Sequence, residues 1–289
     1  PSWPGAPYRA IPSRSRTFSE RTSALARLAE GDFEIAVVSA RTLAIPVPPP
    51  EYIRAHTLFL KVGALFEPDA ISNRLAELGY LRVPSVSLPG EYAVRGEVLD
   101  VYMPGDELAV RIHFDFDRIE RIVRFDPATQ SGKEKTGQVR IRPLKEVVWD
   151  MDAVAYLRQH SLEFAQTESR MDQVIEALSS GGEMQGEEFW FPLAFGRTYS
   201  LIDYAGPNTL FVVVARERID ALSETIRKEY ASMYRLALRE AIVPPPYKIV
   251  FNISELLSSV SAAIFCYALK GIDASAERIS LGAEPPRSY

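Results

Sequence analysis

Alternation along "AVRIHFDF", residues 109–116, predicts a β-strand with one buried and one solvated face. The apolar positions, which we expect to face a core, are Val110, Ile112, Phe114 and Phe116, and the polar positions are Arg111, His113 and Asp115. Neighbouring runs, "LRVPSVSL", "VRGEVLDVY", "RIERIVRF" and "QVRIRPL", have strand length and are separated by turns such as "PG" and "PGDE". Short strands joined in this way indicate an antiparallel or mixed sheet.

A helix and a first strand complete this β-rich unit. "TLFLKVG" follows a proline-rich stretch and begins the unit at about residue 57. Between residues 67 and 79, a helical spacing places Ala70, Ile71, Leu75 and Leu78 on one face. The unit extends to about residue 142.

On either side of the β-rich unit the pattern changes to helices and apolar strands. A helix is predicted at residues 19–31, followed by "FEIAVVSA" at 33–40, whose near-continuous apolar run is typical of a parallel strand buried on both faces. After residue 151 come helices, the apolar strand "TLFVVVA" and a long helix to about residue 240. The simplest fold is therefore an α/β protein: a split parallel-sheet domain with a smaller β-rich α+β domain inserted.

This topology predicts four segments along the chain. Residues 1–56 and 143–270 are the two parts of the α/β domain, 57–142 is the inserted domain, and 271–289 is a linker. The first residues, "PSWPGAPYRAIPSRSR", have the composition of irregular chain and begin without Met, which indicates a fragment.

Composition narrows the classes of function. The 289 residues are 47% hydrophobic and 25% charged, which is ordinary for a soluble globular protein. A net charge of -5 argues against wide, non-specific phosphate binding. The single cysteine, Cys266, lies in an apolar run and is interpreted as a buried thiol in a reducing cytosol. No apolar stretch has membrane-spanning length, and a cytoplasmic location is expected.

The sequence contains no recognisable catalytic constellation. No phosphate-binding glycine loop occurs, because "QSGKEKTG" has the wrong spacing and is interpreted as a polar turn between strands. The histidines, His56, His113 and His160, lack a second His or Cys at ligand spacing, so no metal site is predicted.

Two arginines on the predicted sheet require an explanation. A hairpin through "MPGDE" brings Arg95 close to Arg111, and like charges on one sheet face repel unless something answers them. Either Glu97 or Asp115 answers them internally, in which case Gly96 marks a bulge or a close backbone approach, or the arginines form a docking surface for an acidic partner.

A longer motif surrounds these arginines. The stretch "PGEYAVRGEVLDVYMPGDELAVRIHFDFDRIERIVRFDPATQSG" resembles the segment shared by the bacterial excision-repair UvrB family and the transcription-repair coupling factors, the Mfd family. "GEEFWFPLAF" and the closing "EPPRSY" are similar to further motifs of these families. The coupling factors resemble the chain better, since UvrB carries a phosphate loop and a tyrosine-rich hairpin, and "WPGAPYRAIPSRSRTF" is short with one tyrosine.

The resemblance implies a split UvrB-like, RecA-like but degenerate domain whose inserted domain binds UvrA. The family's contact residues correspond here to Arg95, with Gly96 beside it, to Arg111, and to position 115. The family has phenylalanine at that last position and this chain has Asp115, flanked by Phe114 and Phe116.

The functional hypothesis is therefore a non-catalytic module that recruits UvrA to lesions where RNA polymerase has stalled, for nucleotide excision repair. The module needs no cofactor, whereas the full-length protein, by resemblance, is a DNA translocase that uses ATP and Mg and contacts RNA polymerase and double-stranded DNA. The alternative is a fragment of a UvrB-like ATP-dependent helicase. A third hypothesis, direct DNA binding, predicts binding that weakens steeply with salt.

Overall fold

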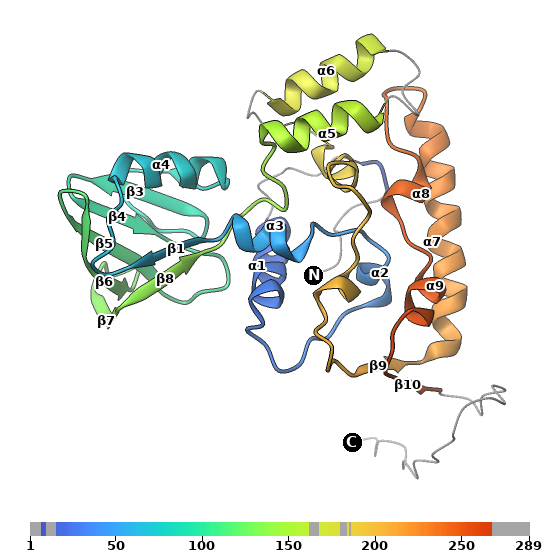
Figure 1. Ribbon diagram of the computed structural model, residues 1–289, viewed down its shortest axis with the longest axis horizontal. Coiled ribbons are helices and arrows are strands. Elements are labelled where there is room, and N and C mark those ends of the chain that lie inside the picture. The colour runs from blue at the N-terminus through green and yellow to red at the C-terminus, as the bar shows by residue number, and fades with distance from the viewer. Residues whose placement is uncertain (1–6, 10–15, 162–167, 180–183, 185, 268–289) are drawn as a thin grey trace.

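The computed structural model describes residues 7–9, 16–161, 168–179, 184 and 186–267. It is a mixed α/β structure in which a β-rich part, with α4 beside it, lies next to a mainly helical part (Figure 1). The linker expected at 271–289 and most of the irregular N-terminal stretch lie outside the described residues. No described helix has the length and apolar character needed to cross a bilayer.

The β-rich part contains one large sheet, one small sheet and one helix. The large sheet has the order β2-β3-β4-β5-β6-β7, with β2 parallel to β3 and every other pair antiparallel. Its strands are β2 (Leu81–Arg82), β3 (Glu91–Arg95), β4 (Val98–Val101), β5 (Ala109–Asp115), β6 (Arg118–Phe125) and β7 (Gly132–Thr136). The small sheet pairs β1 (Leu58–Lys61) with β8 (Gln138–Ile141), and the helix is α4 (Pro68–Glu77).

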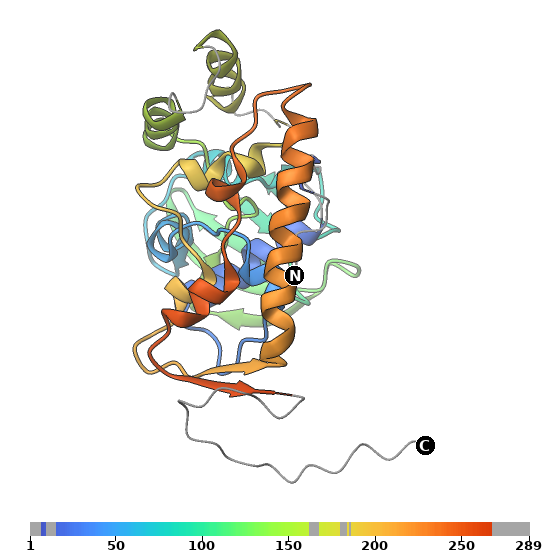
Figure 2. The same ribbon diagram turned by 90° about the vertical axis from the view of Figure 1, so that its right-hand side faces the viewer.

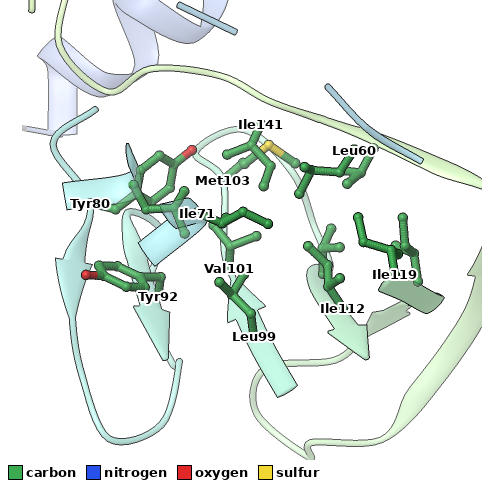
Figure 3. Close-up of a cluster of buried hydrophobic side chains, with 14 of the residues drawn as sticks. Leu60, Ile71, Tyr80, Tyr92, Leu99, Val101, Met103, Ile112, Ile119 and Ile141 are labelled. Carbon is green, nitrogen blue, oxygen red and sulfur yellow. The ribbon is translucent and has the colours of Figure 1, made fainter. Parts of the chain in front are cut away.

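A single apolar core lies between these layers. Ile71 and Leu75 of α4 and Leu60 of β1 pack with Ile112 of β5 and Ile119 of β6. Figure 3 shows Leu60, Ile71, Ile112 and Ile119 within this core. The alternation in β5 is thereby confirmed for Val110, Ile112 and Phe114, and the predicted apolar face of α4 is confirmed except at Ala70, which is exposed. The opposite face of the large sheet carries Arg111 and is therefore free of this core.

Several predictions of strands and turns within the β-rich part are wrong, among them "LRVPSVSL", which is a strand only at β2 (Leu81–Arg82). "VRGEVLDVY" is not one strand: β3 ends at Arg95, Gly96 and Glu97 form a tight turn, and β4 begins at Val98. Gly96 has φ +55° and a side chain there would meet nothing within 4 Å, so it serves the turn and is neither a bulge nor a close approach. "QSGKEKTG" is not a turn, because most of it forms the edge strand β7.

The helical part is built from long and short helices. They are α1 (Arg16–Glu30), α2 (Ala40–Leu43), α3 (Pro50–Ala55), α5 (Met151–Ser161), α6 (Glu168–Ser179), α7 (Arg216–Ala237), α8 (Pro246–Ile249), α9 (Ile253–Ser258) and the 3-10 turns η1 (Glu187–Phe189), η2 (Phe191–Leu193) and η3 (Leu201–Tyr204). The long α7 extends along one side, with the parallel pair β9 (Phe211–Val214) and β10 (Ala263–Cys266) at one of its ends (Figure 2). The predicted strand "TLFVVVA" and the long helix after it are confirmed.

The strand predicted at 33–40 is wrong. Residues 33–39 form no strand within the described structure, and Ile35 and Val37 are 83% and 95% exposed. The apolar run predicted burial on both faces, yet no described strand pairs with it, so the expected parallel sheet is represented only by β9 and β10. Cys266, expected to be buried, is half-buried on β10.

Side chains of α1 join the two parts of the molecule. Arg21 forms a buried ion pair with Glu146, and Glu30 accepts a hydrogen bond from Arg142 at 3.2 Å. Burial is the main reason that the pKa of Glu146 is raised, with Arg21 opposing the shift.

Candidate protein-docking site

The two predicted arginines meet on one buried carboxylate. The turn at Gly96 and Glu97 places β4 between β3 and β5, with Ala93 and Arg111 opposite Asp100 on either side. Asp100 is 0% exposed; it accepts a hydrogen bond from Arg95 Nη2 at 2.5 Å and two from Arg111, from Nε at 2.7 Å and Nη2 at 2.9 Å. The acid that forms ion pairs with the two arginines is therefore Asp100, and neither Glu97 nor Asp115.

Arg111 is held from several directions. Its guanidinium carbon lies 4.3 Å from the ring centroid of Phe125, and Nη2 also donates to Gln130 Oε1 at 2.9 Å. The hydrogen bonds with Asp100 are the largest cause of the raised pKa of Arg111, so its charge is permanent. A two-bond fork of this kind fixes the plane of the guanidinium group.

The motif "FDPATQ", residues 125–130, orients Gln130 toward Arg111. Asp126 accepts hydrogen bonds from the backbone N–H groups of Ala128 and Thr129, and these bonds hold its pKa below the usual range. They close a turn that ends at Gln130, with φ +59°. Gln130 Nε2 donates to Pro127 O at 2.9 Å and to Val86 O, so its amide oxygen is aimed at Arg111.

The arginines retain exposed surface. The Arg95 side chain is 46% exposed and that of Arg111 is 21% exposed. A guanidinium has five N–H donors, and Asp100 and Gln130 use only some of them. The cluster is therefore a positioned pair of cations with donors left for a ligand outside the sheet.

The remaining predicted site residues divide into buried and exposed. Phe114 is 3% exposed in the core, so its assignment as a contact residue is wrong for its side chain, although its N–H donates to Glu97 O at 2.8 Å and joins the two turns. Asp115 is exposed, and its backbone stands opposite that of Arg118 in the β5–β6 hairpin.

Phe116 is not on the buried face where alternation placed it. It lies in the turn after β5, with φ +53°, and it is 82% exposed. A bulky residue with positive φ is rare and costs about 1 kcal/mol. The hairpin therefore holds an aromatic ring in solvent at the same end of the sheet as Gly96.

His113 and Arg121 extend the site beyond the predicted residues. Arg121 Nη2 lies 3.2 Å from each ring nitrogen of His113. Burial and then the charges of Arg121 and Arg111 lower the pKa of His113, so the imidazole is neutral at pH 7.

We expect Arg121→Ala to raise the pKa of His113 toward its ordinary value, because the variant removes the nearest positive charge. An NMR titration of the imidazole protons measures this shift directly. His56, whose pKa is lowered mainly by burial and is not affected by Arg121, is the internal control, and its titration should not change. An unchanged His113 titration would contradict the contact.

Comparisons with known proteins agree with this location. Residues 58–146 match the family model of the UvrB interaction domain. The chain is similar to the transcription-repair-coupling factors of Haemophilus influenzae (30% identical; 73% of this chain and 19% of the relative), Bacillus subtilis (25%; 87% and 22%) and Escherichia coli (26%; 89% and 23%). The resemblance seen in the sequence is confirmed, and the chain spans about a fifth of the length of these relatives.

Proposed function

We infer that this chain, which carries a UvrB interaction domain and is similar to transcription-repair-coupling factors, is the N-terminal module with which such a factor recruits UvrA. The observation that carries the inference is the pair Arg95 and Arg111, fixed on the buried Asp100 and still partly exposed. The docking surface proposed here consists of Arg95, Arg111 and Phe116.

The surface suits a partner that presents a carboxylate. One buried anion balances one of the two arginine charges, so one positive charge is left for the partner. Because Asp100 and Gln130 hold the Arg111 guanidinium in place, little side-chain entropy is lost when it binds. Arginines held in this way are common among residues that dominate interface energies.

Phe116 supplies the apolar part of the contact. It occupies the place next to Asp115, where the family resemblance implies a phenylalanine. Strained backbone that persists in a fold is often linked to function, and an exposed ring is a suitable anchor for a shallow pocket.

We expect Phe116→Gly to raise the free energy of unfolding by about 0.5 kcal/mol, since glycine adopts positive φ without strain. The same variant should weaken UvrA binding about tenfold, because the aromatic anchor is lost. Chemical denaturation and calorimetry measure the two effects. Phe59→Ala, at a half-exposed aromatic of β1, is the control for binding; a Phe116→Gly variant with unchanged affinity would remove Phe116 from the surface.

The module is proposed to be non-catalytic and to need no cofactor. Within the described residues, no cluster of three or more His, Cys, Asp or Glu side chains could hold a metal ion. In the full-length protein, ATP and Mg, RNA polymerase and double-stranded DNA are proposed to bind other domains. The alternative, a fragment of a UvrB-like helicase, predicts measurable ATP affinity in a titration of this chain, and the module proposed here predicts none.

The proposed division of the chain follows from this role. In this proposal, residues 57–142 form the inserted docking domain, and residues 1–56 and 143–270 form the split domain that presents it. Isothermal calorimetry of this chain with UvrA from the same organism tests the function: a saturable one-site isotherm is expected, and the absence of binding would overturn it.

A further inference from the structure

The arginine face carries a second pair of basic residues. Strand register places Arg95, Val98, His113 and Arg121 in one row across β3, β4, β5 and β6, and Asp100, Arg111, Val123 and Lys135 in the next row across β4 to β7. Since side chains alternate along each strand, these two rows lie on the same face of the sheet. The face thus has Arg95 and Arg111 toward one side, and Arg121 and Lys135 toward the other.

The two basic pairs differ in whether a carboxylate neutralises their positive charge. Asp100 ties Arg95 and Arg111, whereas Arg121 and Lys135 are exposed and make no ion pair with any carboxylate in the described part of the chain. Arg121 instead contacts the neutral ring of His113. Of the acids near this face, Glu97 lies in the turn after Arg95, and Glu120 acts on His113 from the bulge beside Arg121.

The two halves of this face differ in how far their side chains are exposed to a charged partner. Loops cover one half of this face, where Val86, Ala93, Ala109 and Phe125 form a small buried cluster. The half with His113, Arg121 and Val123 is not part of that cluster, and its side chains are half-buried or exposed. Exposed, unpaired charges act over about 10 Å at 0.1 M salt, whereas held and paired charges act mainly on contact.

We propose that Arg121 and Lys135 are the electrostatic steering residues of the docking surface, attracting an acidic protein surface toward Arg95 and Arg111. This proposal rests on the proposed function and assigns a different kinetic role to each basic pair. Arg95 and Arg111 give directed hydrogen bonds and set how slowly the partner leaves. Arg121 and Lys135 set how quickly the partner arrives, in agreement with the general effect of peripheral charges on association rates.

Association kinetics with immobilised UvrA test this division. Arg121→Ala/Lys135→Ala should slow association about fivefold in 50 mM salt and leave dissociation within about twofold of the parent. The difference in association should disappear near 1 M salt, where the screening length is about 3 Å. Arg95→Ala should show the opposite pattern, with faster dissociation and nearly unchanged association.

A matched control removes the same net charge elsewhere. Lys61 lies on β1, across the core from the arginine face, and Arg218 lies on α7; both are exposed. Lys61→Ala/Arg218→Ala should retain the parent's association rate. If this control slows association as much as Arg121→Ala/Lys135→Ala, the effect belongs to overall charge and the proposal is overturned.

Other outcomes separate the proposal from the function on which it rests. If Arg95→Ala weakens binding while Arg121→Ala/Lys135→Ala leaves association and its salt dependence unchanged, steering is overturned and recruitment stands. If the parent does not bind UvrA, both are overturned. If the double variant loses affinity for a 20-base-pair DNA duplex and associates with UvrA as the parent does, the second basic pair serves nucleic acid, which also overturns the proposal.

Discussion

Asp100→Asn is expected to lower the free energy of unfolding by about 3 kcal/mol, the low end of the cost of breaking a buried ion pair. The substitution keeps the size of the side chain and removes the charge that holds Arg95 and Arg111 together. Two arginines then face each other across β4, and their repulsion adds to the lost hydrogen bonds. The low end of that range of free energies is expected because both arginines remain partly exposed to water.

Urea denaturation measures this loss. Asp115→Asn is the matched control, since Asp115 is exposed and makes no ion pair with a described residue, and it should change stability by less than about 0.5 kcal/mol. A double-mutant cycle with Arg111→Gln should show coupling of more than about 1 kcal/mol between positions 100 and 111. Additive effects would mean that the ion pair does not stabilise the sheet.

Arg111→Ala is expected to weaken UvrA binding by about 3 kcal/mol, roughly 100-fold in Kd, as for a central interface arginine. It also leaves Asp100 with a single partner, so a loss of stability accompanies the loss of affinity. Arg111→Lys separates the two effects, because lysine keeps the charge and loses the planar fork.

Calorimetry of both variants measures the affinities, and circular dichroism checks that each is folded. Arg111→Lys should bind at least about tenfold more weakly than the parent if the fork is needed. Arg218→Ala, on α7, is the control and should bind as the parent does. Parent-like affinity of a folded Arg111→Ala variant would exclude Arg111 from the interface.

The sequence was sufficient for the elements whose pattern is local. Alternation in β5 identified the buried Ile112 and the outward Arg111, and helical spacing identified α4, because in both cases the core lies on one side of a regular element. Arg95 and Arg111 were correctly expected to lie close together. These predictions needed only the period of each element.

The acid between the arginines was missed because a turn was missed. In a continuous strand, Arg95 and Asp100 are five positions apart and point to opposite faces. The turn at Gly96 and Glu97 reverses the chain, so both residues point to the same face, two residues apart in the pairing register. The "RGE" stretch, with glycine between charged residues in an otherwise apolar run, was the available signal for that turn.

Other features depend on which strands pair with each other, and the residue pattern of one segment does not contain that information. Alternation was extended past the end of β5, which placed Phe116 in the core and not in the hairpin turn. Likewise the apolar run at 33–39 has the composition of a buried strand, but burial requires partner strands on both sides, and none is described there. Arg121 and Lys135 became part of the site only through the register of β5, β6 and β7.

The most direct test of the proposed docking surface is a calorimetric titration of UvrA with the parent chain and with Arg95→Ala. Arg95 is the most exposed member of the arginine pair, so its truncation should cost little stability and disturb the fold least. We predict saturable binding by the parent and a loss of at least about 1.4 kcal/mol, tenfold in Kd, for the variant. Equal affinities for the two proteins would contradict the docking surface.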